Sequence, residues 1–208
     1  QYLHKVGHVS HVAVHPRGIL AQRLHAAGLV TRPLSIRNHL DGIAGWRLRR
    51  MVRKERYDLV HFHTARAHAL SPWVRCLPIK RVVTRRMDYP IHPGWMSHFL
   101  YIKNVDMVVA ISSSVRAALR AADILDTQIR LIPSGIDNKR FEPNANQRAT
   151  VRQRYGLTDD DPLVLAVGAL VERKSYQTLI DAAARLKQNG IALHYLICGV
   201  GPLRPALE

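Results

Sequence analysis

The feature that most constrains the fold is an alternation of two kinds of segment. Short runs rich in Val, Ile and Leu recur along the chain, and stretches with apolar residues every three or four positions separate them. Parallel strands joined by crossover helices produce this alternation, because the strands are buried and their connections are long. The sequence therefore predicts an α/β protein built from Rossmann-like units. We expect strands at 8–14, 58–63, 81–84, 106–111, 129–132, 163–167 and 194–198, and helices at 18–27, 44–56, 65–76, 95–103, 113–122 and 176–188.

The segment from 133 to 162 is different in character. It is rich in Pro, Gly, Asn and charged residues, with one short helical stretch at 149–155. We therefore expect an N-terminal domain at 1–135, a linker at 136–160 and a second domain starting at 161. Only two strands follow this linker, so the second Rossmann-like domain, 161–208, is expected to be incomplete, and the first to lack its first strand.

Charge is unevenly distributed between the two halves. The chain carries a formal net charge of +16, and residues 1–130 hold 21 basic and 7 acidic side chains. A positive lobe of this kind favours anionic partners, which include phosphates, nucleic acid and an acidic membrane surface. The segment 46–56 alone carries six cations beside a predicted core stripe of Ala44, Leu48, Met51 and Val52. It fits either an ordinary covering helix or a contact with anionic lipid head groups.

Cysteine content and hydropathy indicate the compartment. Cys76 and Cys198 are too few for a disulfide framework, and Cys198 lies in an apolar run that we interpret as a buried strand. The sequence lacks the roughly 18 consecutive apolar residues of a transmembrane helix. We expect a cytoplasmic protein, with a peripheral position at the inner face of the membrane as an option.

Two glycine turns follow the last two predicted strands. Gly168 comes directly after the first of them, and Arg173 and Lys174 precede the next helix. A strand-to-helix loop of this kind directs backbone N–H groups and the positive end of a helix toward a phosphate. The alternative is that the two cations are solvated charges near a turn. Gly199 and Gly201 form a second, weaker signal, since the third glycine of a dinucleotide fingerprint is absent.

The basic half offers polar residues at other strand ends. His61 and His63 are two positions apart, so they share one face of a strand. We interpret His61 as a core histidine and His63 as the functional candidate; a metal pair completed by His68 is the weaker alternative. On the acceptor side we single out Arg85, Arg86 and Ser112. The two arginines suit a phosphorylated acceptor, and Ser112 is expected first of all to cap a helix.

These motifs occur in an order that resembles the family 4 glycosyltransferases of GT-B fold. The resemblance covers nearly the whole chain, through the motifs Asp58-x-x-His61-x-His63, Val108-Val109-Ala110-Ile111-Ser112, Ile132-Pro133-Ser134-Gly135-Ile136-Asp137, Val167-Gly168-x-Leu170-x-x-x-Lys174 and Gly199-x-Gly201-Pro202-Leu203. It implies two Rossmann-like domains, an N-terminal one for the acceptor and a C-terminal one for a nucleotide-diphosphate sugar. The expected acceptor is a cell-envelope glycan or a glycolipid.

The resemblance also implies roles for single residues. Lys174 would hold the donor diphosphate and His63 would lie near the transferred sugar, while Gly168, Gly199 and Gly201 would belong to the donor loops. Transfer would retain the anomeric configuration, without a metal ion or other cofactor. The chain departs from the family at two positions. Ala169 stands where Arg is usual, and Arg173 is the candidate to supply the missing charge; Ser175 stands where Gly is usual. The glycine-rich loop and the Glu-x7-Glu segment of the family are expected before Gln1 and after Glu208, so we expect these 208 residues alone to be inactive.

Two other classes remain open. A basic nucleic-acid-binding module would explain the charge, although the chain lacks helix-turn-helix and zinc-finger spacings, so we expect no nucleic acid partner. A GT-B-like enzyme that epimerises or hydrolyses a nucleotide sugar would keep the same donor loops. The transferase is favoured because five motifs occur in the family's order.

Overall fold

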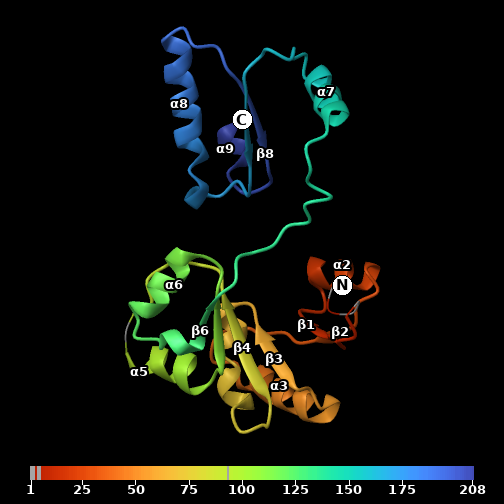
Figure 1. Ribbon diagram of the computed structural model, residues 1–208, viewed down its shortest axis with the longest axis vertical. Coiled ribbons are helices and arrows are strands. Elements are labelled where there is room, and N and C mark those ends of the chain that lie inside the picture. The colour runs from red at the N-terminus through yellow and green to blue at the C-terminus, as the bar shows by residue number, and fades with distance from the viewer. Residues whose placement is uncertain (1–2, 4–5, 93) are drawn as a thin grey trace. The chain divides into compact units, whose positions relative to one another are not determined.

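The computed structural model describes residues 3, 6–92 and 94–208. The chain forms two compact units, residues 1–135 and 136–208 (Figure 1). Helix α7 (Ala145–Arg154) lies within the predicted linker, and Asn144 begins it by accepting a 2.9 Å hydrogen bond from the N–H of Gln147. Within the described residues, no helix is both long and apolar enough to cross a bilayer.

The first unit contains two parallel sheets. Strand β1 (Val12–Val14) pairs with β2 (Thr31–Pro33). Strands β3 (Leu59–Phe62), β4 (Lys80–Arg85), β5 (Met107–Ala110) and β6 (Ile129–Leu131) form a four-stranded sheet in that order. Because all four run parallel, their carboxyl ends lie at one edge, where open α/β sheets bind ligands.

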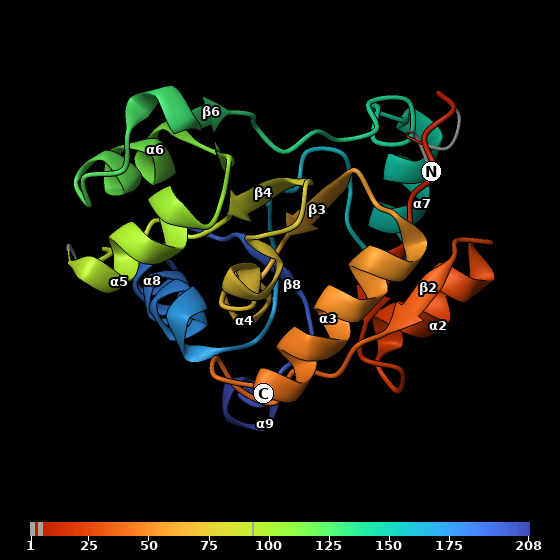
Figure 2. The same cartoon turned by 90° about the horizontal axis from the view of Figure 1, so that it is seen from below.

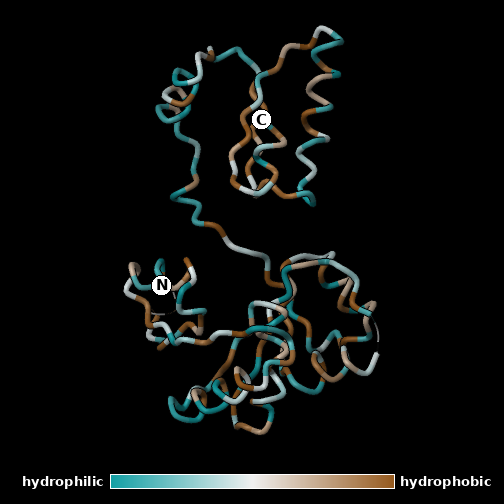
Figure 3. The backbone as a smooth tube through the Cα atoms, turned by 180° about the vertical axis from the view of Figure 1, so that it is seen from behind, coloured by the Kyte–Doolittle hydropathy of each residue, from teal (hydrophilic) through white to brown (hydrophobic). Residues whose placement is uncertain are grey.

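Helices cover this sheet and close its core. The α-helical core residues come from α3 (Gly42–Glu55), α4 (Ala65–His68) and α6 (Ser113–Arg120), and Figure 2 shows α3 beside the sheet. Helix α2 (Ile19–Ala26) packs against β2, and α5 (Trp95–Ser97) contacts the turn that follows it. The predicted stripe of α3 is confirmed: Ala44, Leu48 and Val52 are buried, and Met51 packs against the same core. Figure 3 shows hydrophobic and hydrophilic stretches alternating along the chain. The core contains Leu48, Val52, Phe62, Leu70, Val74, Val83, Val108, Leu119 and Ile129.

Several elements of the first unit differ from the prediction. Strand β2 was missed, because Thr-Arg-Pro contains no apolar run. The helix expected at 65–76 is divided into α4 and a 3₁₀ segment, Ser71–Val74, since Pro72 cannot continue an α-helix. The helix expected at 95–103 becomes the short α5 followed by a π turn, His98–Lys103.

The second unit is a two-stranded parallel sheet with helices. Strands β7 (Leu163–Val167) and β8 (His194–Cys198) and helix α8 (Tyr176–Gln188) have the predicted bounds, and α9 (Arg204–Leu207) follows. The prediction that these strands are buried is wrong. Leu165 is 58% exposed, Val167 is 74% exposed and Cys198 is exposed, because the described elements of this unit cover only part of its small sheet.

Candidate functional site

The carboxyl ends of β3 and β4 bring polar side chains together. The rings of His61 and His63 lie on the same side of the strand, with centroids 4.0 Å apart, as their spacing predicted. Nε2 of His61 is 2.7 Å from Oγ1 of Thr84 on the neighbouring strand. The interpretation of His61 as a core histidine is wrong, because it is exposed while Phe62 faces the core.

The surroundings of both imidazoles favour the neutral form. Loss of water around the ring, followed by repulsion from His63 and Arg86, lowers the pKa of His61 to about 4. Loss of water and the charge of Arg86 also lower the pKa of His63. A neutral imidazole has one donor and one acceptor nitrogen, so the pair can form hydrogen bonds with sugar hydroxyl groups.

The two adjacent arginines have different surroundings. Nη1 of Arg85 donates to the hydroxyl oxygen of Tyr101 at 3.2 Å, and its Nη2 donates to the backbone carbonyl of Tyr89. Arg86 is exposed, and within the described residues its guanidinium forms neither a hydrogen bond nor an ion pair. Arg85 therefore holds local structure, whereas Arg86 is available to an anion.

Ser112 begins helix α6. Its Oγ accepts a 3.2 Å hydrogen bond from the N–H of Val115 and lies 2.9 Å from Oγ of Ser114. The capping role predicted for Ser112 is confirmed. Its contact with an acceptor stays a prediction.

Three further side chains lie near this edge. His68 is 4% exposed, its Nε2 lies 3.2 Å from the carbonyl oxygen of Leu100, and its ring meets Tyr101 edge-on at 4.5 Å. Thr84 contacts His61, and Tyr101 contacts Arg85. Tyr101 was not singled out, because the π turn that brings it there has no local sequence signal.

A metal site completed by His68 finds no support in the geometry. Among the described residues, no three His, Cys, Asp or Glu side chains are grouped closely enough to hold a metal ion. Instead, burial, with a smaller effect of Arg85, lowers the pKa of His68 to about 4. His68 is a packed, neutral side chain.

In the second unit, the loops after β7 and β8 pack backbone against backbone. The N–H of Gly168 donates to the carbonyl of Cys198, and the N–H of Leu170 donates to that of Val200, each at 3.0 Å. A Cβ on Gly199 would overlap the carbonyl oxygen of Gly168, and one on Gly201 would overlap that of Leu170. These two glycines are needed for the packing of the loops, which the sequence alone did not indicate.

Gly168 also borders Tyr176, the first residue of α8. A Cβ at Gly168 would lie 2.8 Å from the Tyr176 hydroxyl oxygen, and Tyr176 is buried. The absence of a side chain at Gly168 therefore lets the loop lie close to the start of this helix.

Arg173 and Lys174 lie in a 3₁₀ turn, Glu172–Lys174, immediately before α8. Both are exposed, and within the described part of the chain neither side chain has a hydrogen bond or ion pair. Ser175 follows in the left-handed region at φ 51° and does not cap the helix through its side chain. The first N–H groups of α8 and two unpaired cations are thus adjacent, an arrangement that suits a phosphate.

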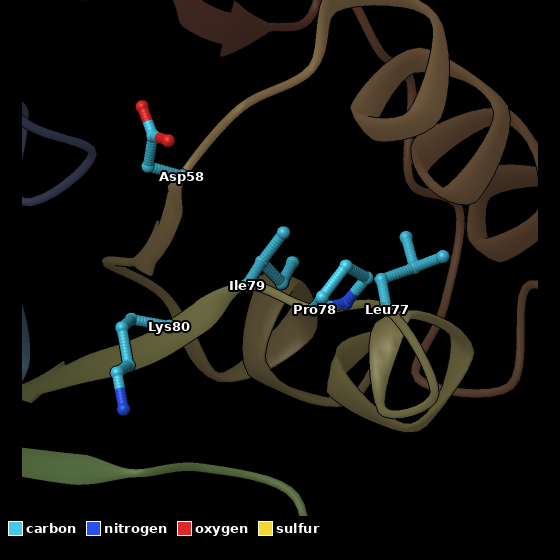
Figure 4. A pocket seen from close by; sticks show the side chains of 5 residues that line it. All are labelled: Asp58, Leu77, Pro78, Ile79 and Lys80. Carbon is cyan, nitrogen blue, oxygen red and sulfur yellow. The ribbon is translucent and has the colours of Figure 1, made fainter.

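A hollow of about 440 Å³ lies at the opposite, amino-terminal ends of β3 and β4 (Figure 4). Asp58, Leu77, Pro78, Ile79 and Lys80 line it, and the Asp58 carboxylate and the Lys80 ammonium point away from each other. It contains none of the candidate site residues.

Comparison with known sequences now identifies the family. The sequence model described as Glycosyltransferase Family 4 matches residues 1–140, about two thirds of the chain. The chain belongs to glycosyltransferase family 4. A second model, Glycosyl transferases group 1, matches residues 147–208 of this family member. The predicted family is confirmed.

One relative of this family 4 chain is a GDP-mannose-dependent alpha-(1-6)-phosphatidylinositol monomannoside mannosyltransferase of Mycolicibacterium smegmatis. It is 29% identical over 170 residues, which cover 78% of this chain and 44% of the relative. The family 4 chain thus spans less than half the length of this relative.

Solved structures show the same fold. A glycosyltransferase from Rickettsia africae matches 99% of this chain and 56% of its own, with a TM-score of 0.73 at 18% identity. Anabaena HepE, solved with UDP and glucose, matches 91% of this chain and 61% of its own, with a TM-score of 0.72 at 14% identity. The GT-B prediction for this family 4 chain is confirmed.

Proposed function

We propose that the chain belongs to an enzyme that transfers a sugar from a nucleotide-diphosphate sugar to a cell-envelope glycan or glycolipid. The main structural support for this proposal is the composition of the loop after β7. There Gly168, the unpaired side chains of Arg173 and Lys174 and the first N–H groups of α8 lie in one short segment. Family membership and the named mannosyltransferase relative support the same chemistry.

The donor loop would act on the leaving diphosphate. As the bond between the sugar and the diphosphate breaks, negative charge grows on the phosphate oxygens, and cations already in place stabilise it. We assign this role to Lys174, with Arg173 supplying the charge that Ala169 lacks. Gly168, Gly199 and Gly201 would keep the loop backbones close enough to contact the donor.

The acceptor would bind at the β3–β4 edge of the first unit. Partial burial and the charge of Arg86 lower the pKa of His63, which favours a neutral ring, and we assign this ring a hydrogen bond to the transferred sugar, with His61 beside it. Arg86 would pair with a phosphate on the acceptor, and Arg85 would position the loop that follows β4. The Ser112 side chain caps α6, so we assign the acceptor contact at this position to the amino-terminal end of α6.

We further propose that transfer retains the anomeric configuration and needs no metal ion. A donor phosphate oxygen would take the proton from the acceptor hydroxyl on the face that the diphosphate leaves. A cytoplasmic protein at the membrane surface would reach a lipid-linked acceptor. Product NMR would report the anomeric configuration, and turnover in excess EDTA would test the metal requirement.

The donor role of Lys174 has a direct test. Nucleotide-diphosphate sugars, including GDP-mannose and UDP-glucose, are titrated calorimetrically into the protein that contains this chain. We expect Lys174→Ala to weaken binding about tenfold or more, because one charge-assisted contact to phosphate is lost. Lys187→Ala, at the other end of α8, is the matched control and should bind as the wild type does. If both variants bind the nucleotide sugars equally well, Lys174 does not belong to the donor site.

A further inference from the structure

Helix α3 presents a second charged surface away from the strand ends. Trp46, Arg49, Arg50, Arg53 and Lys54 line a shallow hollow of about 570 Å³, and we call this set the α3 basic surface. Positions 46, 50, 53 and 54 follow the helical repeat along one side. The buried positions Ala44, Leu48 and Val52 lie on the other side, so the surface faces solvent.

Most of the charge of this surface has no acidic partner among the described residues. Glu55 is the acidic residue of α3, and its carboxylate pairs with Arg32 at 3.1 Å. Arg49 donates to the backbone carbonyl of Trp73 at 3.1 Å. Among the residues that the structure describes, Arg50, Arg53 and Lys54 form no ion pair.

Apolar side chains adjoin these cations. Leu40, just before the helix, is 91% exposed, and Ile43 and Trp46 in its first turns are each 53% exposed. The Arg50 guanidinium lies over the Trp46 ring, 5.5 Å from its centroid. The apolar groups thus lie at the amino-terminal end of α3 and the free cations farther along it.

We propose that the α3 basic surface binds an anionic lipid bilayer, with Arg50, Arg53 and Lys54 at the phosphates and Trp46, Ile43 and Leu40 in the interfacial layer. Cations attract acidic lipid head groups, and Trp with aliphatic side chains is favoured at the boundary between head groups and acyl chains. A nucleic acid would use the same cations. It would leave Leu40 and Ile43 in water, and a single exposed Trp is a poor platform for stacked bases.

The test measures sedimentation of the full chain with vesicles of phosphatidylcholine, with and without phosphatidylglycerol. We expect binding only to the vesicles that contain phosphatidylglycerol, and weaker binding at high salt. The triple variant Arg50→Glu, Arg53→Glu, Lys54→Glu should lose binding at least about tenfold. The control is a second triple variant, which makes the same change in net charge at exposed positions of the second unit: Lys139→Glu, Arg185→Glu, Lys187→Glu. This control should keep most of the binding to the anionic vesicles.

A second variant separates a membrane from a nucleic acid. Leu40→Ser with Trp46→Ser removes apolar groups and leaves every cation, so vesicle binding should fall while retention of duplex DNA is unchanged. Brominated phosphatidylcholine in the anionic vesicles should quench the fluorescence of the wild type more than that of Trp46→Phe. Equal loss in both triple variants, or vesicle binding unaffected by Leu40→Ser with Trp46→Ser, would overturn the proposal. Because the assay contains no sugar nucleotide, it is independent of the proposed transferase activity.

Discussion

Ser175 occupies a backbone conformation that a glycine would adopt more easily. Its φ is 51°, in the left-handed region, and its side chain makes no capping hydrogen bond to α8. We expect Ser175→Gly to raise the free energy of unfolding of the second unit by about 0.5–1 kcal/mol. Thr178→Gly, inside the same helix, should lower it by a similar amount. Urea unfolding followed by circular dichroism measures both free energies of unfolding. A Ser175→Gly variant that is less stable than the wild type would show that other contacts of Ser175 outweigh its backbone strain.

His68 gives the first unit a specific sensitivity to acid. Its pKa is about 4 in the folded protein because the ring is buried, below the ordinary 6.5 of the unfolded chain. As the pH falls through 6.5, the unfolded chain binds a proton that the folded one does not, so stability decreases until about pH 4. The expected loss from His68 at pH 5 is about 2 kcal/mol, and His61, whose pKa is also about 4 but which is more exposed, adds a smaller loss.

The measurement compares urea midpoints at pH 7 and pH 5. His68→Gln should reduce the difference between them, whereas the exposed His39→Gln should leave it unchanged. If His68→Gln shifts by the same amount as the wild type between the two pH values, the acid sensitivity comes from another group.

At the scale of elements, one carboxylate fixes the start of α3. Asp41 is buried and accepts hydrogen bonds from the N–H of Ala44 at 3.1 Å and of Arg37 at 2.9 Å. Nε of Arg37 donates to the same carboxylate at 3.2 Å, and these contacts hold the pKa of Asp41 well below its usual range. Asp41 thus joins the preceding loop to the helix that carries the α3 basic surface.

Substitutions at Asp41 separate its cap from its charge. Asp41→Ala removes both and should lower the free energy of unfolding by about 2 kcal/mol. Asp41→Asn keeps an oxygen that can cap the helix and should cost about half as much. Tryptophan fluorescence in urea reports the loss, since Trp46 lies on α3. Equal costs for Ala and Asn would mean that the charge, not the cap, supplies the stability.

At the scale of the whole molecule, the two units differ in how much they bury. The hydrophobic core described above lies between Leu34 and Ile129, whereas in the second unit the buried side chains among the described residues are Leu170, Tyr176 and Arg152. Apolar burial dominates stability, so the second unit should unfold at lower denaturant than the first.

Two spectroscopic signals can resolve this order. Trp46, Trp73 and Trp95 all belong to the first unit, so fluorescence reports on that unit alone. Circular dichroism also detects α7 and α8. We expect the circular dichroism change to begin at lower urea than the fluorescence change, and coincident curves would show a single cooperative unit.

The local pattern of residues was sufficient for much of this fold. Apolar runs predicted β7 and β8 with their observed bounds, helical spacing predicted α8, and Ser112 marked the start of α6. The motif order predicted the family. These features depend on neighbours in the chain, which the sequence records directly.

Other features were decided by contacts between distant segments. The pairing of β3 with β4 sets His61 beside Thr84, and the carbonyl of Leu170 leaves no room for a side chain at Gly201. Exposure of Val167 depends on which elements cover its sheet. Residue spacing specifies the direction of a side chain within its own strand or helix, but the register and packing of the fold determine what that side chain meets.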